Sequence, residues 1–273
     1  MKNILDTIVA RKWAEIEQAK ENISTKELES TIAFEKPVIS FTKTLEKSHH
    51  EAGIIAEFKR KSPSKGIFNA HAQPDIVCPG YETAGATACS ILTDTDFFGG
   101  RKEDLIAARP LVNIPILRKD FMVDEYQFLE AKSWGADIVL LIAAILSPKR
   151  TLELATFAKS FGLQVLLELH EEEELEHVNQ YVDLVGINNR NLKNFEVDIE
   201  RSARMAEQLN KNYVLVAESG IASPETITYF RGFGFKAFLM GETFMREEDP
   251  ASACRKFIKS IKKVSDAANL TSS

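Results

Sequence analysis

Eight short apolar segments recur along the chain, and they constrain its fold more than any other feature. They lie at residues 53–59, 88–94, 114–120, 137–143, 164–170, 183–189, 213–219 and 236–242. Each segment is continuously apolar rather than alternating, as is typical of parallel strands covered on both faces. Because helical patterns separate them, we predict an α/β fold, a (β/α)₈ TIM barrel. A doubly wound open sheet is the alternative, but it usually has fewer strands and needs a switch point.

The segments between the predicted strands carry start and stop signals for helices. The signals are Asp124, Gln127 and Gly135 after the third strand, Ser147, Pro148 and Gly162 after the fourth, and Ser223, Pro224 and Gly232 after the seventh. A capping residue or proline favours the first turn of a helix, and glycine favours its end. The acidic run 171–174 also predicts a helix, because the helix dipole favours carboxylates in the first turn.

The first fifty or so residues precede every predicted strand and have helical patterns. An apolar stripe runs along the first helix, formed by Ile4, Leu5, Ile8, Val9, Trp13 and Ile16, with Lys12 among the charged residues opposite. Shorter helices are expected over 24–30 and after Ser40. This segment is too short and too polar for a core of its own. We therefore expect one barrel domain over residues 1–273, with residues 1–50 as an N-terminal helical extension.

Composition and cysteine usage exclude several classes of protein. The formal charge of −6 argues against general affinity for nucleic acid or anionic membrane. No apolar run approaches membrane-spanning length, and the amphipathic N-terminus is not a signal peptide. Cys78, Cys89 and Cys254 have no metal-ligand or disulfide spacing, so reduced thiols used as apolar fillers are expected. His49 and His50 are expected at the surface. We expect a cytoplasmic monomer that binds no metal.

Polar side chains gather where the predicted strands end. They are Glu57 and Lys59 in the first strand, Arg118, Lys119 and Asp120 in the third, Glu168 and His170 in the fifth, Asn188, Asn189 and Arg190 in the sixth, Glu218 and Ser219 in the seventh, and Gly241 and Glu242 in the eighth. Singly, each would be a capping or solvated residue. In a barrel, however, these ends meet at one mouth, where such residues form acid/base sites.

Glycines in the last two loops predict an anion site. Gly220 and Gly241 follow the seventh and eighth strands, which is the usual phosphate position in barrels. Ser62, Lys65 and Arg190 would complete a phosphate shell from the other side of the mouth. The first loop lacks the glycine pattern of a dinucleotide site.

Aromatic side chains follow the second and third strands. They are Phe97 and Phe98 in the sequence TDTDFFGG and Phe121 in RKDF. Taken alone, each residue is as well suited to covering the barrel end as to contacting an aromatic ligand. An aromatic substrate would give them a reason to lie beside Lys119.

Together these segments resemble the indole-3-glycerol phosphate synthase family. The resemblance rests on IIAEFKRKSPSKG, YETAGATACSILTDTDFFGG, PILRKDF, ADIVLLIAAIL, VLLELH, GINNRNL, VAESGI and GETFMREEDP, and it covers nearly the whole chain. It implies cofactor-free conversion of 1-(2-carboxyphenylamino)-1-deoxyribulose 5-phosphate to indole-3-glycerol phosphate, with loss of carbon dioxide and water.

The resemblance also implies roles for individual residues. The implied catalytic set is Glu57, Lys59, Lys119, Glu168, Asn188, Glu218 and Ser219. The implied binding set is Ser62, Gly220 and Gly241 for phosphate, with Lys59 and Arg190 assisting, and Phe98 and Phe121 for the anthranilate ring. It also implies that the N-terminal extension lies over the mouth, where Trp13 would help to close the site.

The steps of the implied reaction explain why acidic and basic residues are needed at these positions. Lys119 would act as general acid at the ketone oxygen during ring closure. Dehydration then needs an acid and a base, for which Glu57, Lys59 and Glu168 are candidates, with Lys59 as acid and Glu57 as base the first choice. Another phosphosugar isomerase or aldolase, or a barrel that only binds a phosphorylated ligand, is the alternative. An aldolase would need a Schiff-base lysine of lowered pKa, whereas Lys119 beside carboxylates should stay protonated.

Overall fold

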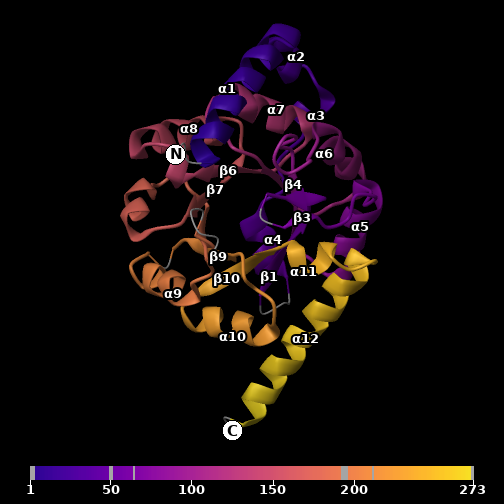
Figure 1. Cartoon of the computed structure of the whole chain (residues 1–273), viewed down its shortest axis with the longest axis vertical. Coiled ribbons are helices and arrows are strands. Elements are labelled where there is room, and N and C mark those ends of the chain that lie inside the picture. The colour runs from indigo at the N-terminus through magenta and orange to yellow at the C-terminus, as the bar shows by residue number, and fades with distance from the viewer. Residues whose placement is uncertain (1–3, 49–51, 64, 192–195, 211, 272–273) are drawn as a thin grey trace.

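The computed structural model describes residues 4–48, 52–63, 65–191, 196–210 and 212–271, and the side chains among these up to residue 264. Eight parallel strands close into a barrel in their order along the chain (Figure 1). They are β1 (Gly53–Phe58), β4 (Ala88–Leu92), β5 (Ile116–Lys119), β6 (Ile138–Ile142), β7 (Gln164–Leu169), β8 (Leu184–Asn188), β9 (Val214–Glu218) and β10 (Phe235–Met240). Each falls within or one residue outside its predicted segment, so the TIM barrel is confirmed.

Helices cover the outside of the barrel. They are α5 (Pro74–Ala84), α6 (Lys102–Ala108), η1 (Arg109–Leu111), α7 (Tyr126–Trp134), η2 (Ala143–Ile145), α8 (Pro148–Ser160), η3 (Glu172–His177), α9 (Ile199–Glu207), α10 (Pro224–Gly232), α11 (Glu242–Met245) and α12 (Pro250–Thr271). The helix predicted in the acidic run is present as η3, which is a 3₁₀ helix. A short hairpin of β2 (Lys61–Ser62) and β3 (Gly66–Ile67), which was not predicted, follows β1.

The predicted capping residues start two of the helices. Ser147 and Ser223 accept hydrogen bonds from the backbone of the first turns of α8 and α10. At α7 the N-cap is Glu125 rather than Asp124. The side chain of Asp124 nevertheless accepts from the backbone N–H of Tyr126 at 2.9 Å. A backbone N–H group in the first turn of α7 thus finds its hydrogen-bond acceptor one residue before the N-cap.

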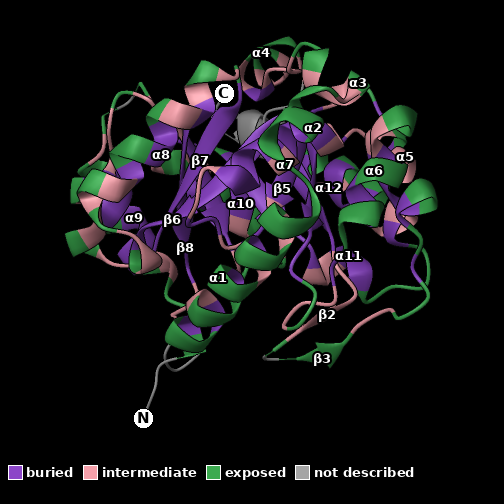
Figure 2. Ribbon diagram, turned by 90° about the horizontal axis from the view of Figure 1, so that it is seen from above, coloured by how far each residue is buried: buried purple, intermediate pink, exposed green. Residues whose placement is uncertain are grey.

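The N-terminal helices approach the barrel from both ends. They are α1 (Ile4–Asn22), α2 (Thr25–Glu29), α3 (Ile32–Glu35) and α4 (Phe41–Lys47). Figure 2 shows α1 at the end of the barrel that carries the β2–β3 hairpin, and α4 at the other end. Phe41 of α4 is fully buried and packs with Ile55 and Leu117 of the barrel interior. Thus α1 lies at the mouth, as expected, whereas α4 closes the bottom.

The buried face of α1 differs from the predicted stripe. Trp13 was placed on that face, but it is 42% exposed. Lys12, placed on the polar face, is only 3% exposed, and it continues the buried line of Leu5, Ile8 and Ile16. Carboxylates of the barrel lie opposite Lys12 and compensate its charge, which makes its burial possible.

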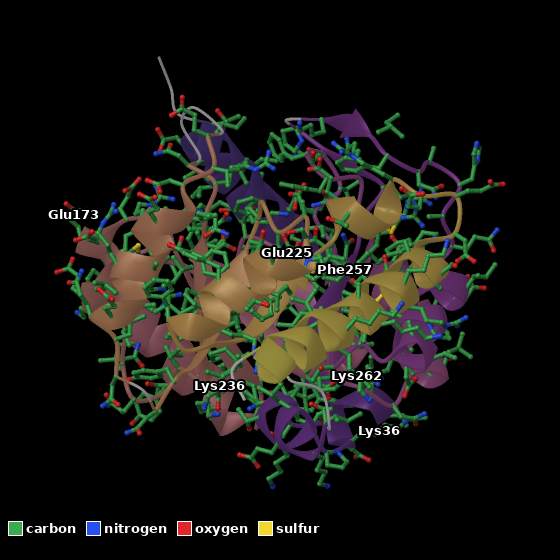
Figure 3. All side chains as sticks on the ribbon, turned by 90° about the horizontal axis from the view of Figure 1, so that it is seen from below. Lys36, Glu173, Glu225, Lys236, Phe257 and Lys262 are labelled. Atoms are coloured by element: carbon green, nitrogen blue, oxygen red, sulfur yellow. The ribbon has the colours of Figure 1, made fainter. Side chains whose placement is uncertain are left out.

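The outer layer is polar and the thiols are buried beneath it. Figure 3 shows α12 running along the outside, and exposed charges such as Lys36, Glu173 and Lys236 lie at the periphery. Cys78, Cys89 and Cys254 are buried and unpaired, as predicted. Within the described ranges, every helix is too short or too polar to cross a membrane. His49 and His50 lie outside the described residues.

Candidate active site

Strand alternation carries functional side chains into the barrel mouth. Side chains two residues apart on a strand point to the same face. Leu117, Leu166 and Val216 belong to the apolar cluster inside the barrel. The next inward positions on these strands are Lys119, Glu168 and Glu218. The apolar filling of the barrel thus ends in a layer of charged groups.

One cavity of about 220 Å³ lies at this mouth. Its walls include all the residues to which the family resemblance assigns a catalytic or binding role: Glu57, Lys59, Ser62, Phe98, Lys119, Phe121, Glu168, Asn188, Arg190, Glu218, Ser219, Gly220 and Gly241. Lys65, by contrast, is exposed on the hairpin. The structure therefore places the candidates together, while their roles in binding and catalysis stay predictions.

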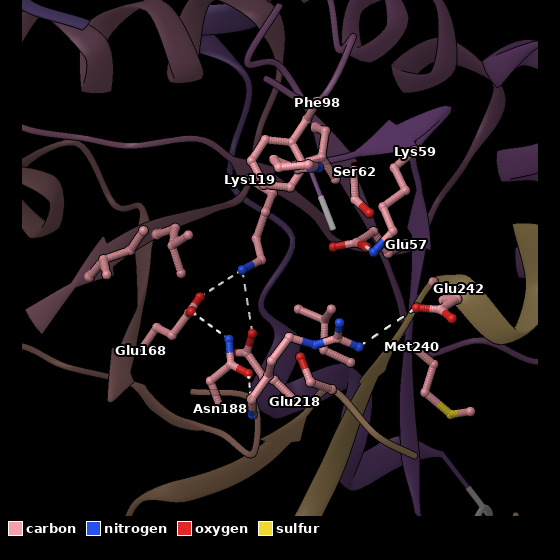
Figure 4. Close-up of a pocket in the computed structure, with 18 of the residues that line it drawn as sticks. Glu57, Lys59, Ser62, Phe98, Lys119, Glu168, Asn188, Glu218, Met240 and Glu242 are labelled. Carbon is pink, nitrogen blue, oxygen red and sulfur yellow. Dashed lines mark hydrogen bonds and ion pairs between the residues drawn. The ribbon is translucent and has the colours of Figure 1, made fainter. Parts of the chain in front are cut away.

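The ammonium of Lys119 is the centre of the charged layer (Figure 4). Its Nζ lies 2.7 Å from Oε2 of Glu168 and 3.4 Å from Oε2 of Glu218. The side-chain amide of Asn188 donates to the other oxygen of Glu168 at 2.8 Å. Burial alone would lower the pKa of Lys119, but the carboxylates of Glu168, Glu218 and Glu57 raise it well above its usual range. Lys119 is therefore charged at neutral pH.

The two carboxylates beside Lys119 are in different electrostatic states. Burial would raise the pKa of Glu168, but Lys119 and then His170 hold it well below its usual range. Burial and the neighbouring charge of Glu168 raise the pKa of Glu218 to about 8, against the effect of Lys119. Oε1 of Glu218 has no hydrogen-bond partner among the described residues. Two carboxyls with pKa values pushed apart are typical of acid/base sites.

His170 is a neighbour of Glu168 that the sequence placed at a strand end without assigning it a role. Its Nε2 lies 3.1 Å from Oε1 of Glu168, although neither ring nitrogen makes an aligned hydrogen bond within the described part of the chain. Burial would lower the pKa of His170, but the close carboxylate of Glu168 raises it. The contact therefore favours the protonated form of His170 beside Glu168.

Glu57 and Lys59 form a second ion pair in the cavity. Nζ of Lys59 lies 2.5 Å from Oε1 of Glu57, and it lies over the ring of Phe68 at 5.8 Å from the centroid. The side chain of Glu57 is 5% exposed, and that of Lys59 is 17% exposed. A buried carboxylate with a partly accessible ammonium beside it can exchange a proton with a bound ligand.

Glycines leave room for two of the carboxylates. A methyl group on Gly186, an inward position of β8, would lie 2.3 Å from Oε1 of Glu218. A methyl group on Gly241 would lie 2.5 Å from Oε1 of Glu57. Both distances are far below van der Waals contact, so each carboxylate occupies the space that a side chain at these positions would need.

The loops after β9 and β10 form the part of the cavity where an anion was predicted. Ser219 has φ of 64° and Gly220 has φ of 69°, so two consecutive residues adopt the left-handed conformation. This conformation is uncommon for a residue with a side chain, and it often marks a functional loop. Gly241 is the N-cap of α11. Arg190 lies 3.7 Å from Glu242 at the same side of the cavity.

The opposite side of the cavity is aromatic and apolar. The rings of Phe98 and Phe121 have centroids 6.0 Å apart. Ile4, Leu5 and Ile8 of α1 add further apolar surface to the cavity. Trp13 and its helix face were expected to close the site, and three earlier apolar residues of that face do line the cavity, but Trp13 does not. Their spacing was visible in the sequence, but nothing there distinguished them from Trp13.

A closed barrel with an acid/base cluster, a glycine-rich loop region and an aromatic wall at its mouth defines a TIM-barrel enzyme. Solved structures agree with this fold. The tryptophan synthase α subunit of Legionella pneumophila matches with a TM-score of 0.61, at 15% identity over 83% of this chain and 98% of that chain. A 3-hexulose-6-phosphate synthase matches with a TM-score of 0.59 at 13% identity, over 77% and 99%. At such identities the likeness shows the fold alone.

Sequence comparison identifies the family. The family model described as indole-3-glycerol phosphate synthase matches residues 5–257. Proteins of that name from Bacteroides thetaiotaomicron and Acinetobacter baylyi are 49% and 40% identical to the chain. The first alignment covers 96% of this chain and 100% of the relative, and the second covers 92% and 93%. The chain therefore belongs to the indole-3-glycerol phosphate synthase family, and it is a carboxy-lyase of tryptophan biosynthesis.

Proposed function

We propose that this chain converts 1-(2-carboxyphenylamino)-1-deoxyribulose 5-phosphate to indole-3-glycerol phosphate with Lys119 as the general acid. The observation that carries this assignment is the position of the Lys119 ammonium between Glu168 and Glu218, inside a cavity with an aromatic wall. The substrate has an aromatic ring at one end and a phosphate at the other. The cavity offers matching surfaces at Phe98 and Phe121 and at the glycine loops.

Ring closure is the first step. The ring carbon that bears the carboxylate attacks the ketone carbon, and the ketone oxygen gains negative charge. Lys119 donates a proton to that oxygen, which becomes a hydroxyl. Because the pKa of Lys119 is raised, the ammonium is fully charged when the substrate binds and stabilises the developing alkoxide before the proton moves. Glu168 and Asn188 hold the ammonium in place.

Decarboxylation and dehydration follow. Release of carbon dioxide leaves its bonding electrons in the ring and restores its aromaticity. The new hydroxyl then leaves as water, and a proton is removed from the adjacent carbon to form the indole double bond. We assign Lys59 as the acid for the departing hydroxyl and Glu57 as the base. Their 2.5 Å contact allows the proton that Glu57 takes up to return to Lys59.

The remaining groups bind and orient the substrate. Ser62, Gly220 and Gly241 are assigned to the phosphate, with Lys59 and Arg190 supplying positive charge. Ser219 and Gly220 both have left-handed backbone, which often marks a functional loop, and this supports the assignment. Ser219 and Glu218 are assigned to orienting the sugar hydroxyls, because the neutral form of Glu218 can donate a hydrogen bond at neutral pH.

The charged state of Lys119 argues against an aldolase. A Schiff base forms only from a neutral amine, and such lysines have lowered pKa values. The pKa of Lys119 is raised instead. Acid catalysis and electrostatic stabilisation suit this lysine better than nucleophilic attack.

The test is direct. Purified protein is mixed with the carboxyphenylamino substrate, and indole fluorescence is followed together with carbon dioxide release. We expect both signals to rise at the same rate, with one carbon dioxide released per indole formed. Absence of an indole signal at high enzyme concentration would refute the proposal. Carbon dioxide without indole would refute the assigned order of steps.

We further propose that the chain is a single-domain monomer of the cytoplasm. Support comes from the site, whose walls are all drawn from one chain, and from three buried, unpaired thiols, which suit a reducing compartment. Light scattering during size-exclusion chromatography tests the monomer, and one calorimetric transition with equal calorimetric and van't Hoff enthalpies tests the single domain. A dimer mass or two resolved transitions would contradict these assignments.

A further inference from the structure

A second buried charge cluster lies between α1 and the barrel, beside the cavity, and of its members only Asp120 lines the cavity. Nζ of Lys12 lies 2.9 Å from Oδ2 of Asp94, 2.9 Å from Oδ1 of Asp120 and 2.8 Å from Oε2 of Glu15. The side chains of Lys12, Asp94 and Asp120 are each at most 3% exposed. Burial of a charged group is costly unless it is paired. The chain therefore bears a desolvation cost to place this ammonium behind the cavity wall.

Each of the two barrel carboxylates also fixes one aromatic wall residue. Oδ1 of Asp94 accepts hydrogen bonds from the backbone N–H groups of Phe97 at 2.8 Å and Phe98 at 3.1 Å. Oδ1 of Asp120 accepts from the backbone N–H of Phe121 at 2.9 Å. The carboxylates that hold the backbones of Phe98 and Phe121 thus share the ammonium of Lys12.

The same lysine also fixes the third part of the apolar wall. Lys12 lies on α1, one turn after Ile8 and two turns after Leu5, and both of these residues line the cavity. An ion pair at Lys12 therefore sets how α1 lies against the mouth. Phe98, Phe121 and α1 are thus all linked to the ammonium of Lys12, the first two through Asp94 and Asp120. Lys12 itself does not line the described cavity.

We propose that Lys12 is a positioning residue that holds Phe98, Phe121 and α1 in the arrangement that binds the aromatic ring of the substrate. The inference deepens the proposed function and rests on it. Without the ammonium, Asp94 and Asp120 repel each other, and the loop that carries Phe98 moves away from Phe121. Lys119 is affected less, because Arg118 at 3.0 Å and Thr93 at 2.6 Å still hold Asp120.

Lys12→Met tests the proposal, because methionine keeps the length of the side chain and removes its charge. We expect KM for the substrate to rise about 10-fold, while kcat stays within about 3-fold, a split that general destabilisation does not predict. Lys20→Met is the matched control. Lys20 lies on the same helix and pairs with Asp124 at 2.9 Å, but it is half exposed, and Asp124 accepts from the backbone of Tyr126 rather than from that of an aromatic wall residue. Its KM should equal that of the parent.

Two ligands separate ring binding from phosphate binding. In Lys12→Met the dissociation constant of indole-3-glycerol phosphate should rise about 10-fold, whereas that of inorganic phosphate should not change. Equal weakening of both ligands would overturn the proposal, as would unchanged binding of both. Asp94→Ala is a second variant for the case in which Lys12→Met does not fold. It removes the acceptor of the Phe98 N–H but leaves Lys12 paired with Asp120 and Glu15, and the same change is expected.

A double-mutant cycle tests whether Lys12 acts through the wall. In a Phe98→Ala background, Lys12→Met should raise KM by no more than about 3-fold, because the ring that it positions is already absent. Full additivity would overturn the proposal. The proposed function fails separately: if the parent protein makes no indole product, the reaction assignment is wrong. If the parent turns over and Lys12→Met has an unchanged KM, only the role of Lys12 is wrong.

Discussion

Among the described residues, two buried clusters have a lysine that bridges two carboxylates, and only one of these two lysines lines the cavity. In the cavity, Lys119 bridges Glu168 and Glu218. Behind the wall, Lys12 bridges Asp94 and Asp120. Lys119 and Asp120 are neighbours on the chain, so alternation at the end of β5 sends one residue to each cluster.

The two clusters differ in how completely their polar atoms are bonded. In the outer cluster both oxygens of Asp120 accept hydrogen bonds or ion pairs, and Lys12 and Arg118 hold its pKa well below the usual range although burial opposes this. In the cavity one oxygen of Glu218 lacks a partner among the described residues, and its pKa rises to about 8. A fully bonded cluster fixes structure, whereas an incompletely bonded one can accept a ligand and exchange protons.

The largest expected effect is on kcat, and it distinguishes Lys119 from Lys12. Lys119→Ala should lower kcat by about 10³-fold, since it removes the general acid and the charge that stabilises the alkoxide. The initial rate of indole fluorescence measures this loss, and near-ultraviolet circular dichroism reports whether the fold is retained. Lys20→Ala, at an exposed pair, is the control and should match the parent. A folded Lys119→Ala variant within 10-fold of the parent would show that the assignment is wrong.

A smaller effect distinguishes the clusters by pH. Because the folded-state pKa of Glu218 is raised from 4.5 to about 8, the folded protein retains a proton that the unfolded chain has released. The stability from Glu218 is therefore complete below pH 4.5 and is lost as the pH rises through about 8. Relative to Glu218→Gln, the parent should lose up to about 1.4 kcal/mol of unfolding free energy per pH unit in this window.

Asp120 provides the control with the opposite sign. Its folded-state pKa is lowered, so its stabilising effect is present above 3.8 and is lost as the pH falls below that value. Urea unfolding from about pH 3 to pH 8 of the parent, Glu218→Gln and Asp120→Asn measures both differences. A constant difference between the parent and Glu218→Gln from pH 5 to pH 8 would contradict the raised pKa of Glu218.

The smallest expected effect shows that burial, and not merely an ion pair, gives the outer cluster its importance. Arg11 pairs with Asp96 at 2.6 Å, between the same helix and the same loop as Lys12 and Asp94, but the two side chains are 52% and 44% exposed. Arg11→Met should cost less than about 1 kcal/mol of unfolding free energy and leave KM within about 2-fold. Chemical unfolding measures the change in free energy, and steady-state kinetics measure the change in KM. A KM change as large as that of Lys12→Met would remove the distinction between the two pairs.

The fold was predictable because the barrel strands are buried on both faces. Continuous apolar runs such as 138–142 indicate parallel strands under helices once eight of them alternate with helical patterns. The gathering of the candidate residues at one end of the barrel was predictable for a related reason, because polar residues such as Glu168 and Glu218 lie at the ends of those runs. A helix at η3 was predicted, but its 3₁₀ type and short length were not. Local acidic residues favour a first helical turn, whereas the backbone turns away at Asn179, whose side chain accepts from Tyr181 N–H.

The orientation of α1 was not predictable from its own sequence. Hydrophobic periodicity places Lys12 on the polar face and Trp13 on the buried face. The partners that reverse this assignment, Asp94 and Asp120, are more than eighty residues away. Nothing local indicates that a lysine will find two buried carboxylates there. A tertiary ion pair overrides the pattern, as tertiary context commonly does.

Gly186 and Gly241 give the site a particular sensitivity to sequence drift. Neither residue carries a functional group, yet alanine at either position would displace the carboxylate of Glu218 or Glu57. Both glycines lie at the barrel mouth, where a displaced side chain can swing into the cavity without unfolding the chain. Mutations there should therefore appear in a genetic selection as tryptophan auxotrophs that still accumulate folded protein, a class otherwise expected from changes to the residues that bind or transform the substrate.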